Sequence, residues 1–362
     1  MRFFLLVIFC LSLAVSDLAQ SGRNKQPDDS PPPRASRPKP SAQLPPSQIL
    51  VKANPVPTPT PPENNADNVD DNDEVIKVES SLVPIPASVT DASGNAVTNL
   101  KLEDFALMVD GKAQEISEIS RSDTPVRLAL LFDNSSSVNI AREFEIKAAI
   151  KFLKKVLRPD RDRAALYSIS SVSQLAQPLT SNTRLLIAAI EAFPPPAGAT
   201  ALLDGVVQAA NYLRDFNDGR HVIVIVSDGV DTLSDVNLTL AATIRKAQLA
   251  DCQIYVVKTT DFESLQRTGR RGSNANTQDL TAERRMQELT AQTGGAVYSP
   301  LDEKELDVAF ANIAADLAQQ YVLSYYPADT RRDGSFKQID LQVKSNKNLT
   351  VRTRKGYYVP KS

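Results

Sequence analysis

Oxygen-bearing side chains follow one of the most apolar runs of the chain. Asp133, Ser135 and Ser137 occupy alternate positions directly after residues 126–132, Val-Arg-Leu-Ala-Leu-Leu-Phe. If that run is a buried strand, one carboxylate and two hydroxyls lie at the rim of a sheet. Hard oxygen ligands of this kind suit a small divalent cation. The segment therefore predicts part of a metal site.

Two further loops supply oxygen ligands. Thr200 closes a Gly-Ala-Thr sequence before an expected helix, and Asp228 with Gly229 follows the apolar run 222–226. Magnesium takes six oxygens and gives up its waters reluctantly. If Asp133 and Asp228 act largely through water while hydroxyls approach directly, the ion keeps much of its positive character. It can then accept a carboxylate from another molecule. We expect Mg²⁺, with Mn²⁺ or Ca²⁺ as alternatives.

Each piece also has a plainer interpretation. Asp133 and the serines could cap a helix that starts near Val138, because Asp and Ser are both favoured N-caps. Thr200 could cap the helix that follows it, and Asp228 with Gly229 could form a simple turn. The order and combination of the three loops favour the metal site.

Composition excludes several classes of protein. A net charge of −2 gives no reason to expect nucleic-acid binding. The chain has a single histidine, His221, so a His-rich zinc site is excluded. We interpret His221 as an edge residue at the start of a strand. After the leader, the only cysteine is Cys252, which we interpret as a small core residue.

The N-terminus predicts export. Residues 1–19 have the pattern of a signal peptide, with Arg2 followed by an apolar run that is too short to span a bilayer. No later segment predicts a transmembrane helix in the mature chain. The destination is the periplasm, the cell surface or the extracellular medium. Residues 20–74 predict a disordered proline-rich linker, because 13 of the 24 prolines fall between Pro27 and Pro62.

The rest of the chain predicts two structural parts. Residues 75–123 and 321–362 are strand-like, and we expect them to pair into one small all-β domain. Residues 124–320 alternate strands at 126–132, 164–170, 222–227, 253–259 and 295–299 with helices at 140–157, 182–193, 200–214, 235–250, 281–292 and 303–319. This α/β pattern predicts a doubly wound, Rossmann-like, mostly parallel sheet inserted in the β-domain. Residues 261–281 are interpreted as a disordered insertion or a loop that shapes partner choice.

The motif residues resemble the von Willebrand factor type A domain and its metal-ion-dependent adhesion site. The match lies in Asp-x-Ser-x-Ser at 133–137, the later threonine and the Asp-Gly after a buried strand. The resemblance implies that the following residues hold the ion: Asp133, Ser135, Ser137, Thr200 and Asp228. Ser136 and Ala199 depart from the glycines that are common in the family. Bacterial exported proteins with flanking β-segments show a similar overall arrangement.

The resulting functional hypothesis is an exported, non-enzymatic protein-binding module that grips an acidic residue of a partner protein. An envelope scaffold with an idle metal site is the first alternative. A hydrolase is the second and weaker one, because Ser135 stands where an aspartyl phosphotransferase would need a second Asp. A serine nucleophile would also need a nearby base. The oligomeric state and the partner are not determined by the sequence.

Overall fold

The computed structural model describes residues 82–121, 123–270, 277–329, 331–344 and 348–361, which belong to one compact unit. The predicted signal peptide (1–19) and linker (20–74) lie outside the described residues. The domain boundaries derived from the sequence stay predictions. Among the described helices, none is long and apolar enough to cross a membrane.

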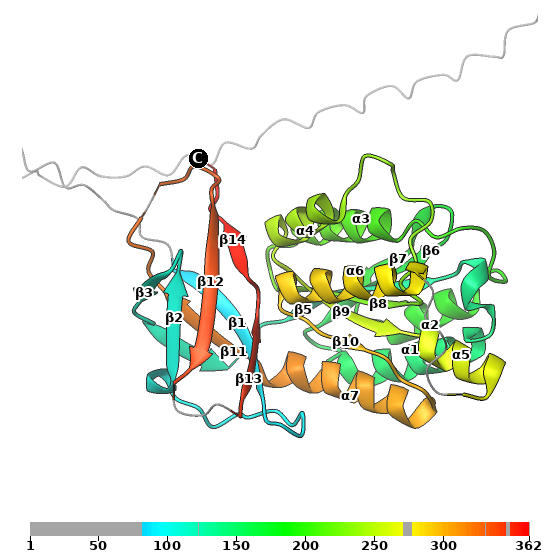
Figure 1. Cartoon of the computed structure of the whole chain (residues 1–362), viewed down its shortest axis with the longest axis horizontal. Helices are drawn as coiled ribbons and strands as arrows, with labels where there is room; N and C mark the ends of the chain where they lie inside the picture. Colours follow the sequence, from blue (N-terminus) through cyan, green and yellow to red (C-terminus); the bar gives the residue numbers. More distant parts are fainter. Residues whose placement is uncertain (1–81, 122, 271–276, 330, 345–347, 362) are drawn as a thin grey trace, which may run out of the picture. The chain divides into compact units, whose positions relative to one another are not determined.

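The α/β part is built on a six-stranded sheet (Figure 1). Its strands lie in the order β10 (Val297–Tyr298), β9 (Cys252–Lys258), β8 (Arg220–Ser227), β5 (Val126–Asp133), β6 (Arg163–Ile169) and β7 (Ser173–Thr180). All neighbours are parallel except β7, which pairs antiparallel with β6 at the edge. Because β5 and β8 are adjacent and parallel, Asp133 and Ser227 end their strands on the same rim.

Helices cover both faces of this sheet (Figure 1). One layer holds α1 (Arg142–Val156), α2 (Thr183–Glu191), α5 (Thr260–Thr268) and α7 (Glu303–Gln319), and the other α3 (Leu202–Arg214), α4 (Leu240–Leu249) and α6 (Thr277–Thr293). Along β5, Leu128, Leu130 and Phe132 join the first core, and Ala129 and Leu131 the second. A central strand must be apolar on both sides, as this one is. The predicted doubly wound sheet is confirmed.

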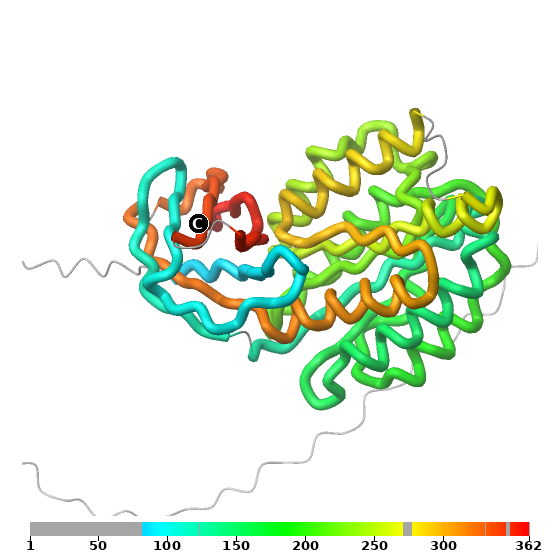
Figure 2. Tube along the Cα trace, turned by 60° about the horizontal axis from the view of Figure 1, so that its bottom comes forward, coloured from blue at the N-terminus to red at the C-terminus, as the bar shows by residue number. Residues whose placement is uncertain are grey.

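The N- and C-terminal segments form a separate pair of four-stranded sheets. One has the order β13 (Thr350–Thr353), β1 (Val83–Thr90), β11 (Tyr321–Tyr325) and β4 (Glu118–Arg121); the other has β14 (Gly356–Tyr358), β12 (Phe336–Val343), β2 (Phe105–Val109) and β3 (Lys112–Gln114). A short 3₁₀ turn, η1 (Leu102–Asp104), precedes β2. Figure 2 shows the cyan N-terminal and the orange-red C-terminal segments side by side. The predicted insertion of the α/β part into one all-β domain is confirmed.

Two elements of the α/β part were not expected. Strand β7 carries polar residues and a proline, Pro178, and its register with β6 shifts twice, which suits an edge strand.

The interpretation of 261–281 as a disordered insertion is wrong for most of the residues of this segment that the structure describes. Residues 260–268 form α5 and residues from 277 onward form α6, while 271–276 lie outside the described residues. Helix α5 was missed because only Phe262 and two polar residues of it are buried.

Candidate metal-binding site

Asp133 ends β5 with its side chain fully buried. Its Oδ1 accepts a 2.9 Å hydrogen bond from the backbone N–H of Ser135, and its Oδ2 accepts one of 2.5 Å from the hydroxyl of Ser227. The hydroxyls of Ser135 and Ser137 lie 2.9 Å apart. The chain then enters a 3₁₀ turn, η2 (Ser136–Asn139), where the Ser135 side chain makes no capping hydrogen bond. The helix-cap alternative for Ser135 is therefore wrong.

Thr200 lies on a loop that is bound to the Asp133 loop. The N–H of Ser136 donates to the carbonyl of Gly198 at 3.1 Å, and the N–H of Ala197 donates to the carbonyl of Asn134 at 3.0 Å. Gly198 has a φ of +81°, and a Cβ there would lie 2.4 Å from the Ser171 hydroxyl. Glycine is therefore required at this position, whereas the alanine at 199 leaves the loop intact.

A third loop, after β8, fixes the backbone of Thr200. The hydroxyl of Thr232 accepts from the N–H of Thr200 at 2.9 Å. The N–H of Thr232 donates to the carbonyl of Thr200, also at 2.9 Å. Asp228, on the same loop, accepts from the N–H of Val230 at 2.9 Å. Hydrogen bonds therefore tie together all three loops that carry the predicted ligands.

The cap of α3 comes from a residue that sequence reasoning missed. Ala201, not Thr200, is the N-cap residue of α3, and no side chain at that position caps the helix. Asp231 does so from the third loop, accepting from the N–H of Leu202 at 2.9 Å and from the hydroxyl of Ser234 at 2.6 Å. The cap alternative for Thr200 is wrong. The turn alternative for Asp228 is correct in part, since its bond to Val230 closes a turn.

The two aspartates form an electrostatically strained pair. Burial raises the pKa of Asp133 to about 6, and the nearby carboxylate of Asp228 adds to this rise. Burial also raises the pKa of Asp228, although hydrogen bonds from Val230 and Ser137 oppose the change. A divalent cation between the two carboxylates would remove this cost, because it favours their ionised forms.

The donors fit a cation with a preference for oxygen. Two carboxylates and two serine hydroxyls lie at one rim, with Thr200 held beside them by its backbone bonds. The described residues contain no group of three or more His, Cys, Asp or Glu side chains that could hold a metal. At this rim, the hydroxyls of Ser135 and Ser137 are uncharged oxygen donors beside the two carboxylates; that they bind an ion stays a prediction.

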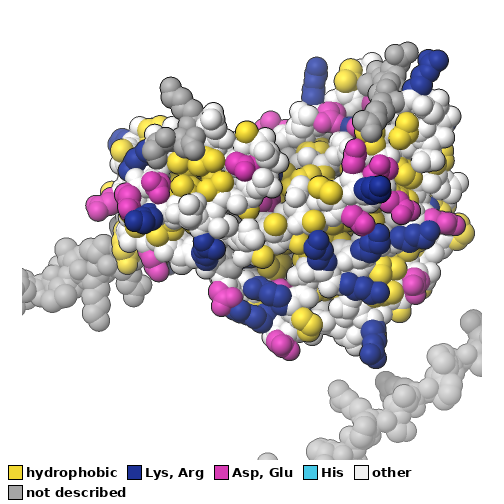
Figure 3. Space-filling model, turned by 90° about the horizontal axis from the view of Figure 1, so that it is seen from below, with side chains coloured by type: hydrophobic (Ala, Val, Ile, Leu, Met, Phe, Trp, Pro, Cys, Tyr) yellow, Lys and Arg dark blue, Asp and Glu magenta, His cyan; other side chains and the backbone are white. Residues whose placement is uncertain are grey.

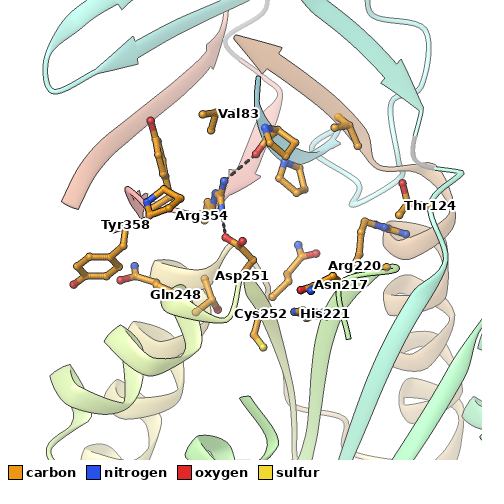
Figure 4. A pocket seen from close by; sticks show the side chains of 18 of the residues that line it. Val83, Thr124, Asn217, Arg220, His221, Gln248, Asp251, Cys252, Arg354 and Tyr358 are labelled. Carbon is orange, nitrogen blue, oxygen red and sulfur yellow. Dashed lines mark hydrogen bonds and ion pairs between the residues drawn. The ribbon is translucent and has the colours of Figure 1, made fainter. Parts of the chain in front are cut away.

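The opposite end of the sheet holds a cavity of about 470 Å³ (Figure 4). It lies between the amino ends of β8 and β9 and the strands of the β-domain, and Arg354 crosses it from Pro84 to Asp251. His221 lines this cavity, and its two ring nitrogens contact the carbonyls of Ala250 and Phe216 at 2.6 and 2.7 Å. The interpretation of His221 as an edge residue is wrong, since β8 is a central strand. Cys252 is buried, as expected.

Charged side chains of both signs lie on the face drawn in Figure 3, and Lys and Arg gather on its lower right part. An ion pair joins α1 and α7, where Lys151 lies 3.0 Å from Asp307.

Comparison with known proteins gives a match within the α/β part. Residues 128–230 match the family described as von Willebrand factor type A domain. The matched segment begins in β5 and ends at Val230, so it contains all five predicted ligands. The chain therefore contains a von Willebrand factor type A domain. No curated protein matches the sequence.

Several solved structures are similar to part of this chain at low identity. A BatB protein from Bacteroides thetaiotaomicron is 15% identical over 53% of this chain and 98% of that one, with a TM-score of 0.42. The vWF domain of the type V pili tip protein Mfa5 from Porphyromonas gingivalis is 16% identical over 53% and 94%, with a TM-score of 0.41. The PilB minor pilin from Streptococcus sanguinis is 15% identical over 54% of this chain and 62% of that one, with a TM-score of 0.40. This chain thus spans about three fifths of the pilin.

Proposed function

We propose that the protein is an exported, non-enzymatic binding module that uses a magnesium ion to grip an acidic residue of a partner protein. The arrangement of Asp133, Ser135, Ser137 and Asp228 at one rim carries this proposal. Hydroxyl donors add no charge, so a bound Mg²⁺ would remain attractive to an external carboxylate. Mn²⁺ or Ca²⁺ could take the same oxygen ligands.

Several contacts support a binding role for the rim. Both oxygens of Asp133 are oriented by hydrogen bonds, and the Thr200 backbone is held from a third loop. Preorganised donors lose little entropy when a ligand binds. The proposal needs no catalytic base, and the single histidine lies at the amino end of β8, whereas Ser135 follows the carboxyl end of β5. A Ser–His pair is therefore out of reach here.

The first experiment measures Mg²⁺ binding by isothermal titration calorimetry. We expect the wild-type chain to bind Mg²⁺ and Asp133→Ala to lose at least tenfold in affinity. Asp160→Ala, an exposed aspartate before β6, is the matched control and should bind like the wild type. Equal affinity in Asp133→Ala and the wild type would contradict the proposal.

A second experiment tests the external carboxylate. Acetate and glutamate serve as probes, since each carries a carboxylate that can complete the ion. We expect either anion to shift the methyl and amide resonances of the three loops only when Mg²⁺ is present. Identical shifts in the presence of EDTA would show that the carboxylate does not bind through the ion.

A further inference from the structure

A second group of buried oxygens lies next to the Asp133 site. Glu145 on α1 is fully buried, and neither of its carboxylate oxygens makes a hydrogen bond of normal geometry to another described residue. On α5, Glu263 is 4% exposed and its Oε1 is also unpartnered. The buried hydroxyl of Thr259, which precedes α5, completes the group. We call these three residues the glutamate pocket.

Packing places the two glutamates close to each other. The neighbouring rings of Phe144 and Phe262 stack with centroids 3.9 Å apart and an angle of 1° between their planes. The N–H of Glu263 donates to the carbonyl of Thr259 at 3.0 Å, and the charge of Glu263 adds to the rise in the pKa of Glu145 that burial causes. The glutamate pocket is therefore one contiguous site between α1 and α5.

The glutamate pocket adjoins the predicted ligands. The N–H of Thr259 donates to the carbonyl of Ser227 at 3.1 Å, and the hydroxyl of Thr260 donates to the carbonyl of Asp228 at 3.0 Å. Asp133 and Asp228 both raise the pKa of Glu145 and Glu263 through their charge. The glutamates therefore lie close enough to the predicted ligands for their charges to interact.

Nearby cations compensate these charges only in part. Arg267 is 64% exposed and its Nη2 lies 4.0 Å from the outer oxygen of Glu263. Burial lowers the pKa of Arg142, and the charge of Glu145 opposes this change. Arg142 donates its hydrogen bonds to Asn134 and to the backbone carbonyls of Phe193 and Pro194. An unpaired buried carboxylate costs several kcal/mol unless it is protonated or bound to a cation.

We propose that Glu145, Glu263 and Thr259 hold a second divalent cation beside the one bound at Asp133. The donors are two carboxylates and one hydroxyl, which suit a cation that prefers oxygen ligands and neutralise its charge. This second ion would be structural, because its ligands leave it little net charge for an outside group. The inference extends the proposed function, whose ion lies next to it.

The experiment counts and locates Mn²⁺ in the full chain. Native mass spectrometry in MnCl₂ should show two ions for the wild type and for Glu143→Gln, an exposed neighbour on α1. Glu145→Gln and Glu263→Gln should each retain one ion. Anomalous diffraction from wild-type crystals in MnCl₂ should show one peak at Asp133 and another between the two glutamates. The diffraction result decides the question even if a variant does not fold.

The possible outcomes separate the two proposals. A single wild-type peak at Asp133 would overturn the second ion and leave the proposed function intact. A single peak at the glutamates would support the second ion and contradict the function proposed for the rim. No bound Mn²⁺ at either place would overturn both.

Discussion

The hydroxyl of Ser227 donates to Oδ2 of Asp133 across a distance of 2.5 Å. The two residues end adjacent parallel strands, and the other oxygen of Asp133 accepts from the backbone of Ser135. The carboxylate is therefore oriented by the protein itself before any ion binds. Such outer contacts commonly change metal affinity by 10- to 100-fold when removed.

We expect Ser227→Ala to weaken Mg²⁺ binding by about tenfold, because one hydrogen bond to a charged group contributes roughly 1.5 kcal/mol or more. Isothermal titration calorimetry measures the change. Ser93→Ala, at an exposed turn of the β-domain, is the control and should bind like the wild type. An unchanged affinity in Ser227→Ala would mean that the ion alone orients Asp133.

Asp231 should stabilise the fold through the start of α3. It accepts from the N–H of Leu202 and from Ser234, and a lost N-cap typically costs about 1–2 kcal/mol. We expect Asp231→Ala to lower the free energy of unfolding by that amount in urea titrations. Asp235→Ala removes an exposed aspartate of the same loop and should change it by less than about 0.5 kcal/mol. Similar losses in both variants would assign the effect to the loop and not to the cap.

The sequence predicted the rim because strand ends and oxygen ligands coincide in it. Apolar runs such as 126–132 and 222–226 identify central strands, and the position of Asp133 and Asp228 follows from them. The sequence could not show which residues orient the ligands. Ser227 stands beside Asp228 in the chain, yet its contact with Asp133 depends on the pairing of β5 with β8.

The glutamate pocket illustrates a second limit. Glu145 follows Phe144 in an amphipathic helix, where a glutamate is normally assigned to the solvent side. The neighbouring Phe144 stacks on Phe262 of α5, a helix whose own sequence is mostly polar. Tertiary contacts between α1 and α5 thus decide the environment of Glu145, and periodicity alone cannot predict such a contact.

Metal-free stability should fall as pH rises. Burial raises the pKa of Glu263 to about 8, and the charge of Asp228 adds to the rise. A glutamate in the unfolded chain titrates near pH 4. The folded protein therefore holds a proton that the unfolded chain releases, so this contribution is complete below about pH 4 and is lost as the pH approaches 8. In EDTA we expect the free energy of unfolding to fall by a few kcal/mol between pH 5 and pH 8.

Glu263→Gln provides the control for this pH dependence, because glutamine does not titrate. Its free energy of unfolding in EDTA should vary less between pH 5 and pH 8 than that of the wild type. Saturating Mn²⁺ should reverse the wild-type trend, since a cation binds the ionised carboxylates. If the wild type and Glu263→Gln show the same slope in EDTA, Glu263 is ionised in the metal-free fold.

The β-domain and the α/β part should unfold together. Helix α7 ends at Gln319 and β11 begins at Tyr321, so a single residue joins them. Beside this junction, Asp316 on α7 forms an ion pair with Arg352 on β13, and the side chains are 5% and 24% exposed. Burial raises the pKa of Asp316, and the charge of Arg352 opposes the rise. This mostly buried ion pair therefore links the α/β part to the β-domain.

Arg352→Met should leave the Asp316 carboxylate buried without its ion-pair partner. We expect this change to lower the free energy of unfolding by about 2–4 kcal/mol. The double variant with Asp316→Asn should recover part of this loss, which gives a coupling energy of about 1–3 kcal/mol in urea titrations. The exposed pair of Lys151 and Asp307 is the control, and its coupling should be smaller, at most about 1 kcal/mol. All variants should show one transition by both tyrosine fluorescence and circular dichroism. Two separate transitions in the wild type would show that the ion pair and the short junction do not make the two parts one cooperative unit.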